Sequence, residues 1–148
     1  MAADTFRYAS SLGEMAYRWD GECCLALRLL QVTPDLPSGS DPVSEWLDAY
    51  LARVALPLPP LVPAHTPFQA RLRDCLAHIP PGETITYGDA ARRLGTAPRA
   101  MGQALGANPF PLLVPCHRVV ASNGGLGGFS CGLEWKRRLL AFESGTGG

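Results

Sequence analysis

The chain begins with short apolar runs separated by turn residues. One run, residues 17–19, ends just before Asp20-Gly21, and a longer run covers residues 23–32. An Asp-Gly pair between two apolar runs is typical of a β-hairpin. The sequence therefore predicts two antiparallel strands in this part of the chain.

A helical pattern follows the hairpin and ends at a proline-rich segment. Asp41-Pro42 is suited to an N-cap and a first helical residue, and apolar side chains recur on one face as far as Leu51. Five prolines fall within residues 55–67, which favours a stiff, extended connector because proline cannot continue a helix or a central strand. We therefore expect an N-terminal domain over residues 1–63 and a C-terminal domain over residues 64–148.

The C-terminal domain is predicted to be mainly helical. Residues 66–79 begin with a capping box and carry proline at the first helical position, and residues 86–95 begin with a second N-cap and end at glycine. Further helices are expected over residues 98–106 and 133–143. The short helices at 86–95 and 98–106, joined by a tight turn, fit a helix-turn-helix, although two simply packed helices give the same pattern.

Composition is that of an ordinary globular protein. Of 148 residues, 47% are hydrophobic and 18% are charged, and no uncharged apolar run approaches the roughly 20 residues that a membrane helix needs. The first residues include an acid and lack the apolar core of a signal peptide, and five cysteines are an odd number for a secreted disulfide framework. We therefore expect a cytoplasmic protein with no membrane partner.

Charge is distributed unevenly although the net charge is zero. Residues 1–63 hold four basic and eight acidic side chains, whereas residues 64–148 hold nine basic and five acidic ones. Only the C-terminal domain has a positive excess that would attract a phosphate backbone. An excess of four charges is a weak indication when taken alone.

Cysteine and histidine carry the candidate chemistry. Cys116-His117 lies between prolines and glycines, a setting that presents side chains rather than filling a core. A free thiol has a pKa of about 8.5 and reacts as thiolate, so a neighbouring base such as His117 or Arg118 would increase the reactive fraction. Glu134 and Glu143 are candidates for a carboxylate that orients the base. For this pair alone, a buried structural thiol is an equally open interpretation.

Two other groupings could suggest a metal, but both are incomplete. Cys75 and His78 lie three apart on one predicted helix, and nothing nearby completes a zinc site. Cys23 and Cys24 would form a cluster with His65 only if adjacent strand residues faced the same way, which a strand does not permit. We expect no metal site from either grouping.

The segment around Cys116 carries a recognisable set of motifs. It contains Pro115-Cys-His-Arg-Val-Val120, preceded by Asn108-Pro109 and followed by a glycine pair and by Lys136-Arg-Arg-Leu-Leu140. Flanking motifs extend the similarity over residues 66–143, namely Thr66-Pro-Phe-Gln69, Ile79-Pro80, Gly82-Glu-Thr84, Thr86-Tyr-Gly88 and Leu133-Glu-Trp-Lys136. Together they resemble the O6-alkylguanine-DNA alkyltransferases, the methylated-DNA–protein-cysteine methyltransferases. The first 63 residues match this family only loosely.

The resemblance implies a DNA repair protein that transfers an alkyl group from guanine O6 to its own cysteine, once. The implied fold is α/β, with a small antiparallel sheet and helix, ribonuclease H-like, before a winged-helix-like domain that contains the helix-turn-helix. The implied partner is double-stranded DNA carrying O6-alkylguanine, bound through its minor groove by a monomer without metal or cofactor. O4-alkylthymine as a second substrate is left open.

Matching positions also imply roles for individual residues. Cys116 would accept the alkyl group, and His117 with Glu143 would form the relay that ionises it through a water molecule. Asn108 would brace the segment before the cysteine, and Tyr87 would press on the phosphate of the flipped nucleotide and assist proton transfer to the leaving base. The remaining candidates would contact DNA or the flipped base: Arg99 in the vacated stack, Ala100 on the same helix, Val119 and Ser130 through main-chain groups, and Leu105 and Phe129 as apolar walls.

General chemistry agrees with these roles. An in-line attack on the alkyl carbon requires the nucleotide to leave the base stack. The helix predicted at residues 98–106 carries alternating alanines and glycines, which would let its backbone approach a minor groove, although small residues also serve helix packing.

Three features depart from the family pattern. The segment from Tyr87 to Arg99 is about two residues short, Phe129 replaces a tyrosine and Cys131 replaces a glycine. Two other classes of function compete with alkyl transfer. One is a non-catalytic lesion-binding protein, although relatives of that kind lack the cysteine, and the other is a thiol hydrolase, which would turn over repeatedly.

Overall fold

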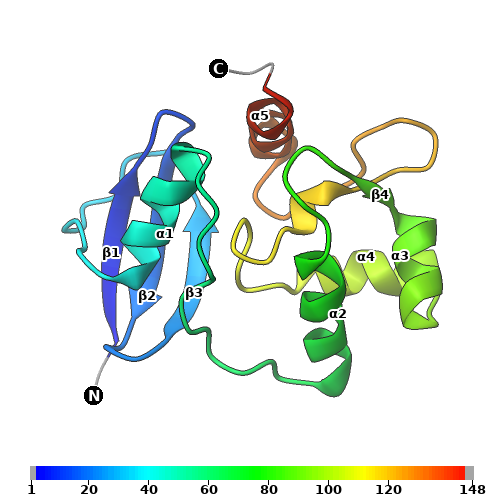
Figure 1. The fold of residues 1–148 in the computed structure, drawn as a ribbon, viewed down its shortest axis with the longest axis horizontal. Coiled ribbons are helices and arrows are strands. Elements are labelled where there is room, and N and C mark those ends of the chain that lie inside the picture. The colour runs from blue at the N-terminus through cyan, green and yellow to red at the C-terminus, as the bar shows by residue number, and fades with distance from the viewer. Residues whose placement is uncertain (1–2, 146–148) are drawn as a thin grey trace. The chain divides into compact units, whose positions relative to one another are not determined.

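The structure is a computed structural model that describes residues 3–145, and the chain divides into two compact units, Met1–Pro63 and Ala64–Gly148. Within the described residues, the first unit holds a three-stranded sheet and one α-helix, and the second holds four α-helices and a two-stranded sheet (Figure 1). The predicted α/β class is confirmed. None of the helices in residues 3–145 has the length and apolar content required to cross a membrane.

The sheet of the first unit is antiparallel, with strand order β1-β2-β3. Its strands are β1 (Asp4–Ala9), β2 (Glu14–Trp19) and β3 (Cys24–Leu29). The sequence predicted two strands, so the prediction missed β1. Reciprocal backbone bonds between Ser10 and Gly13 close a two-residue hairpin loop, but the loop residues Ser11-Leu12 lack the Asn-Gly or Asp-Gly signal of such a turn.

The predicted hairpin turn between β2 and β3 is confirmed. The Asp20 carboxylate accepts hydrogen bonds from the backbone N–H groups of Glu22 and Cys23, at 2.8 and 2.7 Å. Gly21 has a φ of +97°, a conformation that glycine adopts without a steric cost. The Asp-Gly pair therefore fixes this turn as its chemistry predicts.

One helix, α1 (Pro42–Leu51), lies across a face of this sheet (Figure 1). Its N-cap is Asp41, as predicted, and this carboxylate accepts from the N–H groups of Val43 and Ser44 and from the buried Tyr17 hydroxyl. The cap thus also bonds the helix to β2. Apolar side chains between helix and sheet form the core of the unit: Met15, Tyr17, Leu27, Leu29, Val43, Leu47 and Tyr50.

The proline-rich connector is extended and is bonded to the first unit. The N–H of Cys24 donates to Pro60 O at 2.8 Å, and the N–H of Val62 donates to Cys24 O at 2.9 Å. Residues 60–62 therefore lie along the outer edge of β3.

In the second unit, the first two helices begin at the predicted caps, and the third begins at Pro98, as predicted, without a side-chain cap. They are α2 (Pro67–Ala77), α3 (Tyr87–Leu94) and α4 (Pro98–Gly106). The Thr66 side chain accepts from the N–H of Gln69 at 3.1 Å, and the Thr86 side chain caps α3 in the same way. The predicted boundaries are confirmed to within two residues.

A tight turn joins α3 and α4. Gly95 ends α3 in the left-handed conformation, with a φ of +67°, and α4 begins three residues later. The Gln69 amide of α2 donates to Ala104 O at 3.2 Å and ties the pair to α2. The two helices therefore have the compact helix-turn-helix arrangement that the sequence suggested.

The last part of the chain adds a short 3₁₀ helix, η1 (Cys116–Arg118), and the final helix α5 (Leu133–Ser144). Between them, β5 (Val119–Val120) pairs in parallel with β4 (Ile85–Thr86). The sequence did not predict this sheet, since two-residue strands show no alternation. The core of the unit includes Leu72, Leu76, Met101, Phe110, Leu113, Val119, Trp135 and Leu139.

Candidate active site

A pocket of about 490 Å³ opens in the second unit, and the Cys116 side chain contributes to its lining. Cys116 is 5% exposed, so the pocket gives this otherwise buried thiol access to a ligand. The lining also includes Tyr87, Pro98, Arg99, Gly102, Leu105, Gly106, Gly128, Phe129 and Ser130. Six of the predicted site residues therefore meet in one cavity.

Asn108 fixes the irregular segment that leads to Cys116. Its side chain donates to Val114 O at 3.1 Å and accepts from the N–H of Phe110 at 3.0 Å. At the end of this segment, Pro115 forms an inverse γ-turn in which the Cys116 N–H donates to Val114 O at 2.7 Å. The Asn108 side-chain bonds and the Cys116 N–H bond to Val114 O thus fix the backbone that carries the thiol.

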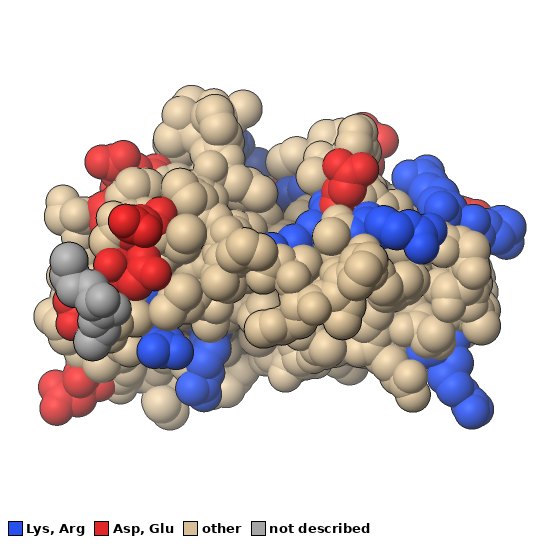
Figure 2. Space-filling view, turned by 90° about the horizontal axis from the view of Figure 1, so that it is seen from below, with Lys and Arg blue, Asp and Glu red and all other residues tan. Residues whose placement is uncertain are grey.

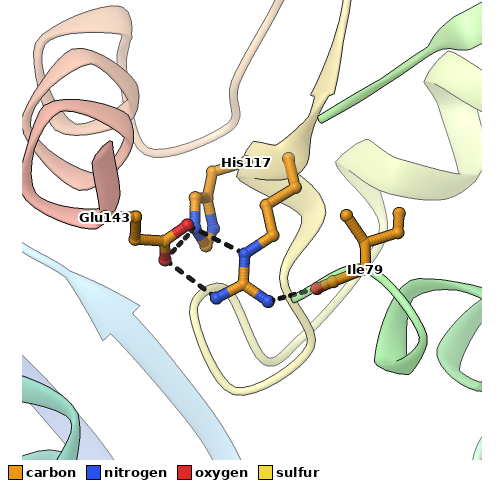
Figure 3. Close-up of polar contacts among 4 residues, drawn as sticks. Ile79, His117 and Glu143 are labelled. Atoms are coloured by element: carbon orange, nitrogen blue, oxygen red, sulfur yellow. Dashed lines mark hydrogen bonds and ion pairs between the residues drawn. The ribbon is translucent and has the colours of Figure 1, made fainter. Parts of the chain in front are cut away.

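His117 follows Cys116 in the chain, does not line the pocket and is fully buried. Its Nε2 lies 2.7 Å from Glu143 Oε2 of α5 (Figure 3). Because a carboxylate only accepts, we assign the ring proton to Nε2, which leaves a lone pair on Nδ1. Among the described residues, Nδ1 has no hydrogen-bond partner, so it is free to accept a proton.

Arg118 is bonded to Glu143 rather than placed as a base for the thiol. Its Nε and Nη2 donate to the two carboxylate oxygens at 2.8 and 2.9 Å, and its Nη1 donates to Ile79 O at 2.6 Å (Figure 3). Glu134, the other candidate for orienting the base, has a side chain that is 57% exposed and forms ion pairs with its helix neighbours. The geometry therefore selects Glu143.

Burial and these contacts set the charge states of the site. Burial raises the pKa of Cys116 to about 11, against an opposing hydrogen bond from Asn108. Burial also lowers the pKa of His117. Burial would raise the pKa of Glu143, but hydrogen bonds from His117 and Arg118 outweigh it and lower that pKa to about 2. At neutral pH the site therefore holds a neutral thiol, a neutral imidazole and a carboxylate.

Tyr87, at the start of α3, also lines the pocket. Its hydroxyl accepts from the N–H of Gly128 at 3.1 Å and donates to Gly128 O at 3.3 Å. The ring packs against Gly127, where an added Cβ would collide with it and where φ is +76°. Glycine is therefore required at 127 for the loop to close over Tyr87.

The exposed surface of α4 borders the pocket. Arg99 is exposed at its first turn, and a Cβ added at Gly102 or Gly106 would meet no atom within 4 Å. Packing within the protein does not explain these two glycines, whereas the buried Ala104 does belong to the core. The open glycines leave the helix backbone accessible to a large ligand.

Two predicted contact residues lie outside the pocket lining. Ala100 is half-buried on α4, and Val119 is fully buried. The carbonyl of Val119 accepts from Lys136 Nζ at 2.8 Å. Neither residue is among those that line the cavity with Cys116.

Lys136 is a site residue for which the sequence predicted no role of its own, although it belongs to the family motif. It is fully buried, and its Nζ also donates to Gly128 O at 2.9 Å. A signal was present, because Lys136 and Glu143 are seven residues apart and share one side of α5. Two charged residues at that spacing on a buried face indicate a functional site.

The other cysteine and histidine groupings form no comparable site. Cys75 and His78 border a second groove on α2, and His78 Nδ1 lies 2.7 Å from Asp74 O. In residues 3–145, no three His, Cys, Asp or Glu side chains gather in a way that could hold a metal ion.

Comparison with known proteins matches the second unit to one family. The model of the 6-O-methylguanine DNA methyltransferase DNA-binding domain matches residues 67–145. A methylated-DNA–protein-cysteine methyltransferase of Methanothermobacter thermautotrophicus is 47% identical over 78 residues, which are 53% of this chain and 44% of that protein. One of Metallosphaera sedula is 53% identical over 76 residues, 51% of this chain and 48% of that protein. The chain thus matches about half the length of these curated relatives.

Solved structures match most of the chain. Mycobacterium tuberculosis OGT, in a crystal structure with DNA, has a TM-score of 0.82 and 33% identity, covering 96% of this chain and 93% of that one. The O6-methylguanine-DNA methyltransferase of Pyrococcus kodakaraensis has a TM-score of 0.72 and 26% identity, covering 96% and 99%. The family model covers more than half of this chain and includes the pocket, Cys116 and the His117–Glu143 pair. The chain therefore belongs to the 6-O-methylguanine DNA methyltransferase family.

Proposed function

We propose that this protein repairs DNA by transferring the alkyl group of O6-alkylguanine to Cys116, in a single turnover. The observation that carries the proposal is the position of Cys116 in the pocket lining, next in the chain to the buried His117 that is paired with Glu143. The reaction needs no cofactor, since its two participants are the thiol sulfur and the alkyl carbon. O4-alkylthymine, which presents a similar alkyl–oxygen bond, is a further substrate to test.

The proposed chemistry begins with removal of the thiol proton. The neutral His117 accepts it at Nδ1 through a bridging water, while Glu143 stabilises the imidazolium that forms. The Cys116 thiolate then attacks the alkyl carbon in line, so that an S–C bond forms as the C–O6 bond breaks. The guanine leaves with the bonding electrons and takes up a proton, which the hydroxyl of Tyr87 would donate in place of its bond to Gly128 O.

The target base reaches Cys116 only if its nucleotide leaves the duplex. Extrusion costs a few kcal/mol of unstacking, which a pocket for the base and a plug for the gap offset. Leu105 and Phe129 provide apolar pocket walls, and the Ser130 main chain lies beside them. Arg99 is the exposed side chain at the pocket edge that is long enough to enter the vacated stack.

We propose that α4 docks in the minor groove. Gly102 and Gly106 leave its backbone open, and a repair protein needs contacts to the DNA backbone but no base code. On the face shown in Figure 2, most Asp and Glu side chains cover the first unit and most Lys and Arg side chains cover the second. This charge distribution assigns phosphate binding to residues 64–148.

Finer features of the fold and its setting belong to the same proposal. The first unit would be a reduced ribonuclease H-like domain, and the second a winged-helix-like domain built around α3 and α4. The protein would act as a monomer in the cytoplasm, because one pocket and one acceptor cysteine suffice for one lesion.

Intact-protein mass spectrometry after incubation with duplex DNA containing O6-methylguanine tests the proposal. We expect one methyl group per protein, located on Cys116 by peptide mapping, and none on Cys116→Ser, which should still bind the DNA. Methylation of Cys23, Cys24, Cys75 or Cys131 instead would contradict the assignment. Repeated turnover would indicate a hydrolase, and binding without transfer a lesion-recognition protein.

A further inference from the structure

Lys136 is a buried cation whose hydrogen-bond partners in the structure are neutral. Its Nζ donates to Val119 O at 2.8 Å and to Gly128 O at 2.9 Å, and its side chain is fully buried. Buried lysines are normally paired with a carboxylate, because the isolated charge is costly to bury. On its own helix, however, the Glu143 carboxylate is engaged by His117 and Arg118.

The groups that face this ammonium come from the elements around the pocket. From α3, the Tyr87 ring lies with its centroid 5.6 Å from Nζ, within the range of a cation–π contact. From η1, the Cys116 thiol and the His117 ring interact with it electrostatically. From the loop, Gly128 O accepts from both Lys136 and Tyr87. One ammonium therefore links the β5 strand, the loop and α3 around the thiol.

We infer that Lys136 is a positioning residue that fixes the Tyr87–Gly128 wall of the pocket and supplies the counter-charge for the Cys116 thiolate. This inference rests on the proposed alkyl transfer and names a further residue for it. Once the proton has passed to His117, the thiolate becomes the anion that the buried ammonium otherwise lacks.

The charge states of the two groups agree with this pairing. Burial lowers the pKa of Lys136 to about 8, and the Cys116 charge opposes that shift. Burial raises the pKa of Cys116 to about 11, and the Lys136 charge opposes that shift in turn. Burial thus disfavours both the isolated Lys136 ammonium and the isolated Cys116 thiolate, and each ion is stabilised when the other is present. The ammonium also lowers the pKa of His117, which keeps the imidazole neutral and able to accept the proton.

The first test measures Cys116 reactivity without DNA. Wild type, Lys136→Met and Lys136→Arg are treated with iodoacetamide across the neutral to alkaline range, and the rate at Cys116 is followed by peptide mass spectrometry. The matched control is Arg137→Met, which removes an exposed cation from the next position of the same helix. Removing the Lys136 charge should lower the rate at Cys116 below about pH 8, where the lysine is charged, by about tenfold for each unit by which the thiol pKa rises.

The arginine variant should lie between wild type and Lys136→Met, and the Arg137→Met profile should match wild type. A Lys136→Met protein with native circular dichroism and an unchanged Cys116 rate below pH 8 would overturn the inference, since a purely structural lysine does not change the reactivity of the thiol.

A second test does not depend on whether Lys136→Met folds. The Lys136 ammonium is titrated by NMR of its labelled Cε in wild type and in Cys116→Ser. Serine does not ionise in this range, so the lysine should titrate at lower pH in the variant than beside the thiolate. Identical titrations would overturn the inference even if methyl transfer from DNA occurs. If the Lys136 titration differs between the two proteins but no methyl group is transferred from DNA, the proposed function is contradicted and the inference about Lys136 is not.

Discussion

Burial, more than any single neighbour, sets the resting state of Cys116. The sequence suggested that adjacent His117 and Arg118 would increase the thiolate fraction, whereas in the structure burial raises the thiol pKa to about 11. Arg118 contacts Glu143 and Ile79. Cys116 therefore rests as a neutral thiol, and in the proposed reaction its ionisation would depend on the free Nδ1 of His117.

Replacing Glu143 with glutamine should slow transfer without abolishing it and shift the pH–rate profile to higher pH. An amide cannot stabilise the His117 imidazolium with a full charge, so the thiol loses its proton less readily. Single-turnover rates across pH measure this effect, with Glu134→Gln, an exposed position on the same helix, as the control. An unaltered profile in Glu143→Gln would show that this carboxylate has only a structural role.

The same substitution should lower stability, because the buried Arg118 guanidinium loses its anion. Breaking a buried pair in this way costs about 3–5 kcal/mol. The pKa of Glu143 is lowered to about 2, so its stabilising contribution is complete above the ordinary carboxyl range and is lost as pH falls toward 2. Denaturant unfolding should therefore show a gap between wild type and variant at neutral pH that narrows in acid.

Cys131 should restrict the size of the alkyl groups that the pocket accepts. It is half-buried and follows Phe129 and Ser130 of the pocket lining. Cys131→Gly removes a β-carbon and a sulfur and should raise the benzyl transfer rate more than the methyl rate. Competition between O6-methylguanine and O6-benzylguanine in DNA measures the ratio, and an equal ratio in both proteins would show that Cys131 does not limit the pocket.

At the scale of elements, the sequence predicted the helix caps, which are local, but not the pairing of strands that are distant in the chain. Asp41, Thr66 and Thr86 cap helices where the sequence predicted, because a cap needs only groups within three residues. The β4–β5 pair joins residues more than thirty positions apart through two-residue strands, which leave no periodic signal. Lys136 was overlooked for a related reason, since a lysine is expected at the surface unless its buried partners are known.

Arg99→Ala should impair repair of duplex DNA more than reaction with the free base O6-benzylguanine. The exposed position of Arg99 at the first turn of α4 lets it fill the gap that the flipped nucleotide leaves, and the free base requires no extrusion. Single-turnover rates on both substrates measure the difference, with the exposed Arg93→Ala of α3 as a matched loss of charge. Equal losses on both substrates would mean that Arg99 supports the fold of the pocket.

At the scale of the molecule, the motif string predicted the family, and the charge balance favours the second unit as the one that would meet DNA. The family model covers residues 67–145, which are the residues with the positive excess. The first unit carries a negative excess and a sheet that the sequence reproduced only in part. The family was thus easier to predict than the fold, because one motif string identifies it while strands can be built from many sequences.

Raising the salt concentration should weaken DNA binding but leave alkyl transfer in the pocket nearly unchanged. Binding of duplex DNA by the basic residues of the second unit releases counter-ions, with a slope of about −0.9 per phosphate contacted on a logarithmic scale. If three arginines each neutralise one phosphate, a fourfold rise in salt lowers DNA affinity by about 40-fold. Transfer from free O6-benzylguanine involves no phosphate, and its relay of His117, Glu143 and Arg118 is buried and poorly screened. Fluorescence anisotropy with duplex DNA should therefore show a steep salt dependence, while the free-base transfer rate in the same buffers stays nearly constant. A parallel fall of both quantities would instead place the salt-sensitive interactions within the pocket.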